Sequence, residues 1–100
     1  MSNKAILEQA TVIFKRDYPG LSAEAIICFL VTMDLGQPTV GDVARAVGMT
    51  EPTAYQHLSL LTGSGAGLIV LINTGDGRNQ IQLTDKGQAV AAAVNQALAG

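Results

Sequence analysis

The sequence predicts a small, mainly α-helical domain that carries one β-hairpin. The chain has 100 residues, of which 48% are hydrophobic, enough for a single core but not for two. Apolar residues recur at helical spacing through most of the chain. Residues 67–84 instead contain two short apolar or alternating runs around a turn-rich tip, which is the pattern of a hairpin. We therefore expect residues 1–100 to form one domain.

The first two helices are predicted from periodicity and from their end signals. Residues 3–17 form the first helix, and Pro19-Gly20 ends it. Its apolar positions are Ile6, Ala10, Ile13 and Phe14. Ser22 is a good N-cap for a second helix, which runs to about Leu35 and is apolar nearly all round. This second helix is predicted to be the centre of the core.

Residues 39–62 contain two short helices joined by a tight turn. Thr39 and Asp42 have the spacing of a capping box, so a helix starts there. Gly48 is a natural left-handed C-cap, and Thr50 caps the next helix over residues 51–61. The apolar positions of the pair are Val40, Val43, Ala44, Val47, Ala54, Leu58 and Leu61. Two such helices around a glycine-containing turn predict a helix-turn-helix.

The hairpin follows this helix pair directly, after a glycine-rich loop. An unbroken apolar run at 68–72 predicts one strand, and the alternation at 80–83 predicts a second, half-buried strand. Residues 73–79 form the tip, and Thr84 caps a final helix from Asp85 to about Leu98. A hairpin in this position is a wing, so the predicted fold class is winged helix-turn-helix.

The segment from Asp76 to Gly87 resembles the wing of the MarR family of bacterial regulators. It contains D-x-R, an alternating strand and then L-T-x-x-G. Ala44-x-x-x-Gly48-Met49-Thr50 matches the broader winged-helix pattern, and the step from Gln56 through His57 to Leu58 resembles the ArsR branch. The resemblance covers roughly residues 20–90.

The resemblance implies a homodimeric transcription regulator, and we expect a repressor that reads a palindromic operator in double-stranded DNA. Residues 51–61 would be the recognition helix in the major groove. Arg78 would enter the minor groove, with Asp76 orienting its guanidinium or the hairpin. The terminal segments 1–18 and 85–100 offer apolar faces for dimerisation, although packing against the second helix would also cover them. A small-molecule effector is common in the family, and the sequence does not identify one.

The side chains left to face DNA are polar. Gln can bind adenine through two hydrogen bonds, Thr can touch a thymine methyl group, and Tyr can bind phosphate. Arg45 and Lys86 are candidates for flanking phosphates, and a strip that joined them to Arg78 would favour DNA binding. The predicted DNA-binding residues are Arg45, Thr50, Glu51, Thr53, Tyr55, Gln56, His57, Asp76, Arg78 and Lys86. The alternative for each is an ordinary polar surface position.

Composition supports a second hypothesis, a winged-helix module that binds proteins and not DNA. The formal net charge is −2, whereas DNA-binding domains are usually basic. The predicted recognition helix has no Lys or Arg, and glycines occupy the loop before the wing. A fold does not determine a function, so both hypotheses stay open at this point.

The remaining motifs predict no enzyme, no cofactor and no metal site. His57 has no second His or Cys at metal-ligand spacing, and Cys28 sits in an apolar run typical of core. A single cysteine is compatible with a reducing compartment. The N-terminus lacks a signal-peptide pattern, and the longest apolar run is too short to cross a bilayer. We therefore expect a cytoplasmic protein without a membrane partner.

Overall fold

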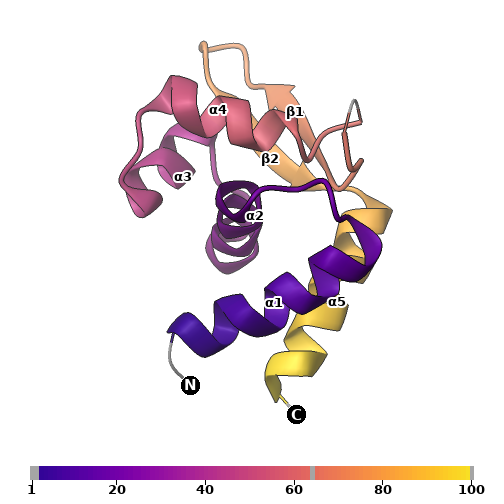
Figure 1. Cartoon of the computed structure of the whole chain (residues 1–100). Coiled ribbons are helices and arrows are strands. Elements are labelled where there is room, and N and C mark those ends of the chain that lie inside the picture. The colour runs from indigo at the N-terminus through magenta and orange to yellow at the C-terminus, as the bar shows by residue number, and fades with distance from the viewer. Residues whose placement is uncertain (1–2, 64, 100) are drawn as a thin grey trace.

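The computed structural model describes residues 3–63 and 65–99, and it has the predicted mainly helical fold with one hairpin (Figure 1). The elements are α1 (Asn3–Asp17), α2 (Ala23–Leu35), α3 (Val40–Val47), α4 (Glu51–Ser59), β1 (Ile69–Asn73), β2 (Asn79–Leu83) and α5 (Asp85–Ala99). The hairpin lies at one end of the molecule, α1 and α5 lie at the other, and α2 runs between them. The fold is a MarR-like winged helix.

The helix-turn-helix is defined by local capping, as the sequence predicted. Thr39 accepts a hydrogen bond from the Asp42 N–H at 3.2 Å, and the Asp42 carboxylate accepts one from the Thr39 N–H at 2.9 Å. Gly48 ends α3 with φ 76°, and the Thr50 side chain caps α4. The prediction for the end of α4 was too long. The helix stops at Ser59, because the chain tightens into a turn in which the Leu61 N–H bonds to the Leu58 carbonyl.

The core is built against α2, which has one fully buried face and half-buried apolar residues beside it. Phe29 of α2 meets Phe14 of α1 edge-on, with ring centroids 5.4 Å apart. Leu58 of α4 and Ile81 of β2 are also fully buried. Cys28 lies in this core, as expected, and burial followed by the charge of Glu24 raises the pKa of its thiol.

The wing is a two-stranded antiparallel sheet attached to the helix-turn-helix. Leu71 pairs with Ile81 at its middle, and the observed β1 is shifted by one residue from the predicted run at 68–72. The Ile81 N–H donates to the carbonyl of Pro38 at 2.8 Å, and Gln80 forms a β-bridge with Thr39. The start of α3 is therefore fixed against the hairpin.

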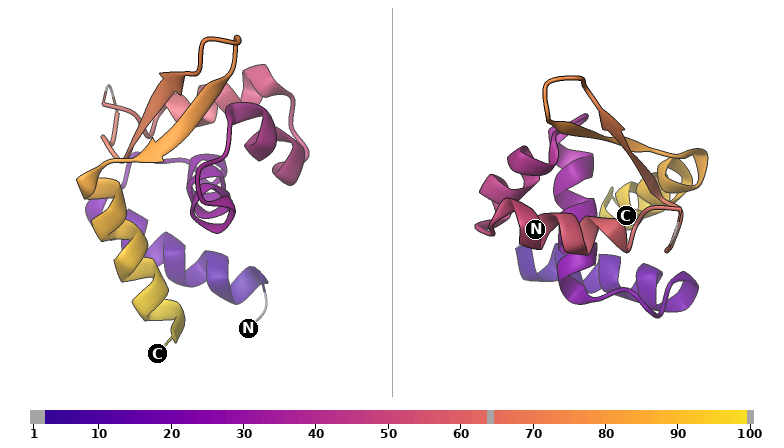
Figure 2. Two further views of the ribbon diagram at one scale, coloured as in Figure 1. Left: turned by 180° about the vertical axis from the view of Figure 1, so that it is seen from behind. Right: turned by 90° about the horizontal axis from the view of Figure 1, so that it is seen from above.

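The last helix is held at its start by the residues of the L-T-x-x-G motif. Thr84 Oγ1 donates to the Gly67 carbonyl at 2.7 Å and accepts from the Gly87 N–H at 3.0 Å. From there α5 runs beside α1, which the two views in Figures 1 and 2 both show. Val90 and Val94 are buried, whereas the side chains of Ile6 and Leu98 lie outside the described part of the chain.

Helix α1 carries exposed apolar surface as well as this internal contact. The Val12 side chain on α1 is 68% exposed, although its neighbours Ala10 and Phe14 are fully buried. In the described part of the chain, no helix has the length and apolar character needed to cross a membrane.

Candidate nucleic-acid interface

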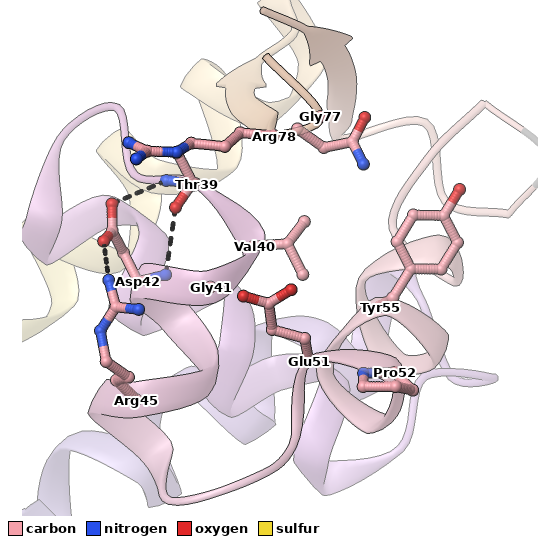
Figure 3. Close-up of a pocket in the computed structure, with 11 residues that line it drawn as sticks. Thr39, Val40, Gly41, Asp42, Arg45, Glu51, Pro52, Tyr55, Gly77 and Arg78 are labelled. Atoms are coloured by element: carbon pink, nitrogen blue, oxygen red, sulfur yellow. Dashed lines mark hydrogen bonds and ion pairs between the residues drawn. The ribbon is translucent and has the colours of Figure 1, made fainter.

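A groove of about 550 Å³ separates the hairpin tip from the first turns of α3 and α4 (Figure 3). The starts of α3 and α4 supply one wall, and the hairpin tip supplies the other. The lining residues are Thr39, Val40, Gly41, Asp42, Arg45, Glu51, Pro52, Tyr55, Gly77, Arg78 and Asn79. Residues from three separate parts of the chain thus meet at one surface.

The hairpin tip is ordered around the carboxylate of Asp76. This carboxylate accepts hydrogen bonds from the Thr74 hydroxyl and, at 3.2 Å, from the Arg78 N–H. The Arg78 Nε lies 3.6 Å from Asp76 Oδ2, and 72% of the Arg78 side chain stays exposed. The Thr74 hydroxyl, then the Arg78 N–H and the Arg78 charge lower the pKa of Asp76. Asp76 therefore stays ionised and holds Arg78 at the rim of the groove.

The opposite wall contains a second carboxylate–arginine pair. Asp42 accepts from Arg45 Nη2 at 2.5 Å while it also caps α3. The backbone N–H and hydroxyl of Thr39, followed by the charge of Arg45, lower the pKa of Asp42. Each arginine of the groove is thus partly neutralised by a nearby aspartate.

The exposed face of α4 presents the polar side chains that the sequence predicted. Glu51, Thr53, Tyr55 and Gln56 are exposed and His57 is half-buried, whereas Ala54 and Leu58 face the core. Of these, Glu51 and Tyr55 line the groove and the others lie elsewhere on α4. The Thr50 hydroxyl donates to Thr53 Oγ1 at 2.9 Å, which ties the cap to the first turn.

Lys86 does not belong to this groove. Its Nζ lies 5.3 Å from the centre of the Tyr18 ring, where α1 ends and α5 begins. Arg45 and Arg78 both line the groove, but the three basic residues do not form the single strip that would have favoured DNA binding. Lys86 is at the base of the hairpin, because Thr84 closes that base by bonding to Gly67.

Seven residues of the groove were not among the predicted site residues, and three of these seven have polar side chains. Thr39 and Asp42 were identified only as a helix start, and Asn79 only as part of the hairpin tip. The capping pattern located Thr39 and Asp42 in sequence. Their place opposite the wing depends on the Pro38–Ile81 hydrogen bond, a long-range contact that no local signal indicates.

The lowered pKa values of Asp42 and Asp76 predict how the stability of the domain depends on pH. Their pKa values are lowered by folding, so the stability they contribute is present above the ordinary aspartate value of about 3.9 and is lost as pH falls through the folded value. We expect them to leave the melting temperature unchanged between about pH 7 and 5 and to lower it below about pH 4.

Asp42→Asn tests the contribution of that aspartate separately, because Asn keeps an oxygen that can cap α3 but cannot be ionised. Melting curves from pH 7 to pH 2.5 should show a shallower acid decline for the variant than for the wild type. Parallel declines would show that Asp42 does not contribute in this way.

No protein-family model matches the sequence, and no curated protein matches it. Several solved structures share the fold. AbfR bound to DNA superimposes with a TM-score of 0.71 at 20% identity, over 96% of this chain and 69% of AbfR. NadR in complex with 4-hydroxyphenylacetate gives a TM-score of 0.71 at 18% identity, over 94% of this chain and 65% of NadR.

BpsR of Bordetella bronchiseptica, whose DNA binding is regulated by 6-hydroxynicotinic acid, gives a TM-score of 0.65 at 18% identity. The match covers 95% of this chain and 74% of BpsR. The chain spans only 64% of AbfR in its disulfide-formed structure. At such identities these neighbours show a common fold.

Proposed function

We propose that this winged-helix chain is a DNA-binding transcription regulator. The observation that carries the proposal is the groove in which the first turn of α4 and Arg78 of the wing lie on opposite sides. A helix in the major groove and a hairpin arginine in the adjacent minor groove would place a sugar–phosphate strand between them. A groove between these two elements supports such an arrangement.

In this proposal the two arginines have different partners on DNA. Arg78 enters the minor groove, where a narrow A·T-rich segment concentrates negative potential. Arg45 and Tyr55 meet phosphate oxygens, and Thr53 and Gln56 reach base edges from the exposed face of α4. Asp76 positions Arg78 through the ordered hairpin tip. Thr50, His57 and Lys86 stay predicted DNA-binding residues, and the proposal gives them no specific contact with DNA.

The regulator is proposed to be a homodimeric cytoplasmic repressor with a palindromic operator. The exposed Val12 on α1 would lie in the contact between two copies around a two-fold axis. The recognition helices would then meet half-sites about 34 Å apart, one turn of DNA. A small-molecule effector of unassigned chemistry is also proposed, because NadR binds 4-hydroxyphenylacetate and the DNA binding of BpsR is regulated by 6-hydroxynicotinic acid.

A binding titration tests the proposal. Purified protein is titrated against the DNA upstream of its own gene and against an unrelated duplex of equal length, at several salt concentrations. We expect tighter binding to the upstream DNA and an affinity that falls as salt rises, because each neutralised phosphate releases counterions. Binding to neither duplex at low salt would overturn the proposal.

A protein-binding module is the second candidate, and a specific observation favours it. Both arginines of the groove are paired with aspartates, and Glu51 adds a further carboxylate. Val70 and Ile72 of β1 are exposed and apolar, as protein-binding surfaces often are. If no DNA binds, a screen for partners should compare the wild type with Val70→Lys, which would disrupt that surface.

A further inference from the structure

Glu51 occupies an unusual place in the groove, directly against the first turn of α3. An ideal Cβ at Gly41 would lie 2.5 Å from Glu51 Oε1 and 3.4 Å from Glu51 Cδ. Gly41 is itself buried, and Figure 3 shows the Glu51 carboxylate beside it, between α3 and the wing. The carboxylate therefore fills the space that any larger residue at position 41 would take.

The surroundings of this carboxylate are those that attract an anion. The first turn of a helix carries positive partial charge, because its N–H groups lack partners within the helix. In α3 the N–H groups of Asp42 and Val43 bond to Thr39, and the β-bridge between Thr39 and Gln80 turns the Val40 N–H toward the Asn79 carbonyl. The N–H of Gly41 finds no acceptor among the described residues. Arg45 Nη1 lies 3.5 Å from the same Cβ position, so a guanidinium also faces this space.

We propose that Glu51 is an internal competitor for DNA phosphate and sets the affinity of the interface. The inference rests on the proposed function, because a phosphate of the bound strand would approach this helix start and Arg45. In the protein without DNA, the Glu51 carboxylate already places a negative charge at this helix start. Asp42 differs from Glu51, since its carboxylate is bonded to the Thr39 backbone and belongs to the helix cap.

Glu51→Gln removes the charge and keeps the size of the side chain. We expect it to bind both the upstream and the unrelated duplex about fivefold more tightly at low salt, the effect of removing about one close charge repulsion in water. The slope of log affinity against log salt concentration should become steeper, by up to about the contribution of one phosphate contact. A gain on both duplexes is expected because phosphates carry no sequence information.

Gly41→Ala tests the same contact from the other side. The added methyl group meets the far end of a flexible side chain, so Glu51 can swing away at small cost. We expect Gly41→Ala to tighten DNA binding as Glu51→Gln does, and the double variant to gain no more than Glu51→Gln alone. Such non-additivity is the sign of two residues that act through one contact.

Two matched controls separate this local effect from a general one. Glu24→Gln makes the same charge change in the first turn of α2, and Glu24 does not line the groove. Gly20→Ala adds a methyl group that meets no atom within 4 Å. Both should bind DNA as the wild type does, and melting curves of every variant verify the fold.

The outcomes distinguish this inference from the proposed function. If the wild type binds DNA and Glu51→Gln binds equally or more weakly, the competitor role is wrong and DNA binding stands. A loss confined to the upstream duplex would show instead that Glu51 reads a base. If neither protein binds DNA, both proposals fall, whereas binding by Glu51→Gln alone supports the competitor. If both Gly41→Ala and the double variant bind more weakly, the added methyl group obstructs DNA. The result for Glu51→Gln alone then tests the competitor role.

Discussion

Arg78→Ala is expected to weaken binding to the upstream DNA by about 10- to 100-fold at low salt. Hydrogen bonds of a charged group are worth about 1.5–3 kcal/mol, and this guanidinium is the side chain that the wing would place in the minor groove. Because 72% of the side chain is exposed and its ion pair with Asp76 is the only one it makes with the described residues, its removal should leave the fold intact. Fluorescence anisotropy across a salt series measures the change.

Arg16→Ala is a matched control for this variant. Arg16 is also an exposed arginine, 70% accessible, and its Nε is paired with a neighbouring aspartate, Asp17, at 3.3 Å. It lies in the last turn of α1 and does not line the groove. Equal losses for the two variants would mean that net charge, and not the wing, determines affinity.

Gly87→Ala is expected to destabilise the domain by about 3 kcal/mol or more, although alanine is normally favoured over glycine within a helix by about 1 kcal/mol. An added Cβ would lie 1.9 Å from the Leu68 carbonyl oxygen and 2.9 Å from its carbon. These are backbone atoms at the start of the wing, so they cannot move aside as a side chain can. Chemical denaturation measures the loss of unfolding free energy.

Gly63→Ala serves as the reference, since its added methyl group meets no atom within 4 Å. It should change the unfolding free energy by no more than about 0.5 kcal/mol. An unchanged or raised stability in Gly87→Ala would contradict the close approach of α5 to β1. The DNA affinity of the folded fraction gives a second measure, because a displaced wing would also move Arg78.

The sequence indicated most of the elements because their signals are local. The Thr39–Asp42 capping box, the Gly48 turn and the alternation from Gln80 to Leu83 each operate within a few residues, and each was found in place. Bounds were less accurate. The last turn of α4 and the first residue of β1 depend on packing around Leu61, whose carbonyl accepts from both Leu68 and Ile69.

The candidate site was only partly predictable, for a physical reason. The sequence identified Arg45, Glu51, Tyr55 and Arg78 as residues suited to a DNA interface, from residue type, helix face and the wing motif. It could not show that these four share a groove, or that Lys86 lies outside it beside Tyr18. These relations depend on the Pro38–Ile81 hydrogen bond and on how α5 is seated, which are contacts between distant segments.

The sequence by itself therefore determined the helices, the turn and the hairpin, because capping and periodicity act between near neighbours. Only the tertiary structure decided that the Glu51 carboxylate lies in the space a Gly41 side chain would fill. It also decided that Gly87, in the first turn of α5, lies directly against the Leu68 carbonyl. Both are close contacts between separate segments of the chain. A single sequence shows the glycine, but it does not show which atom lies against it.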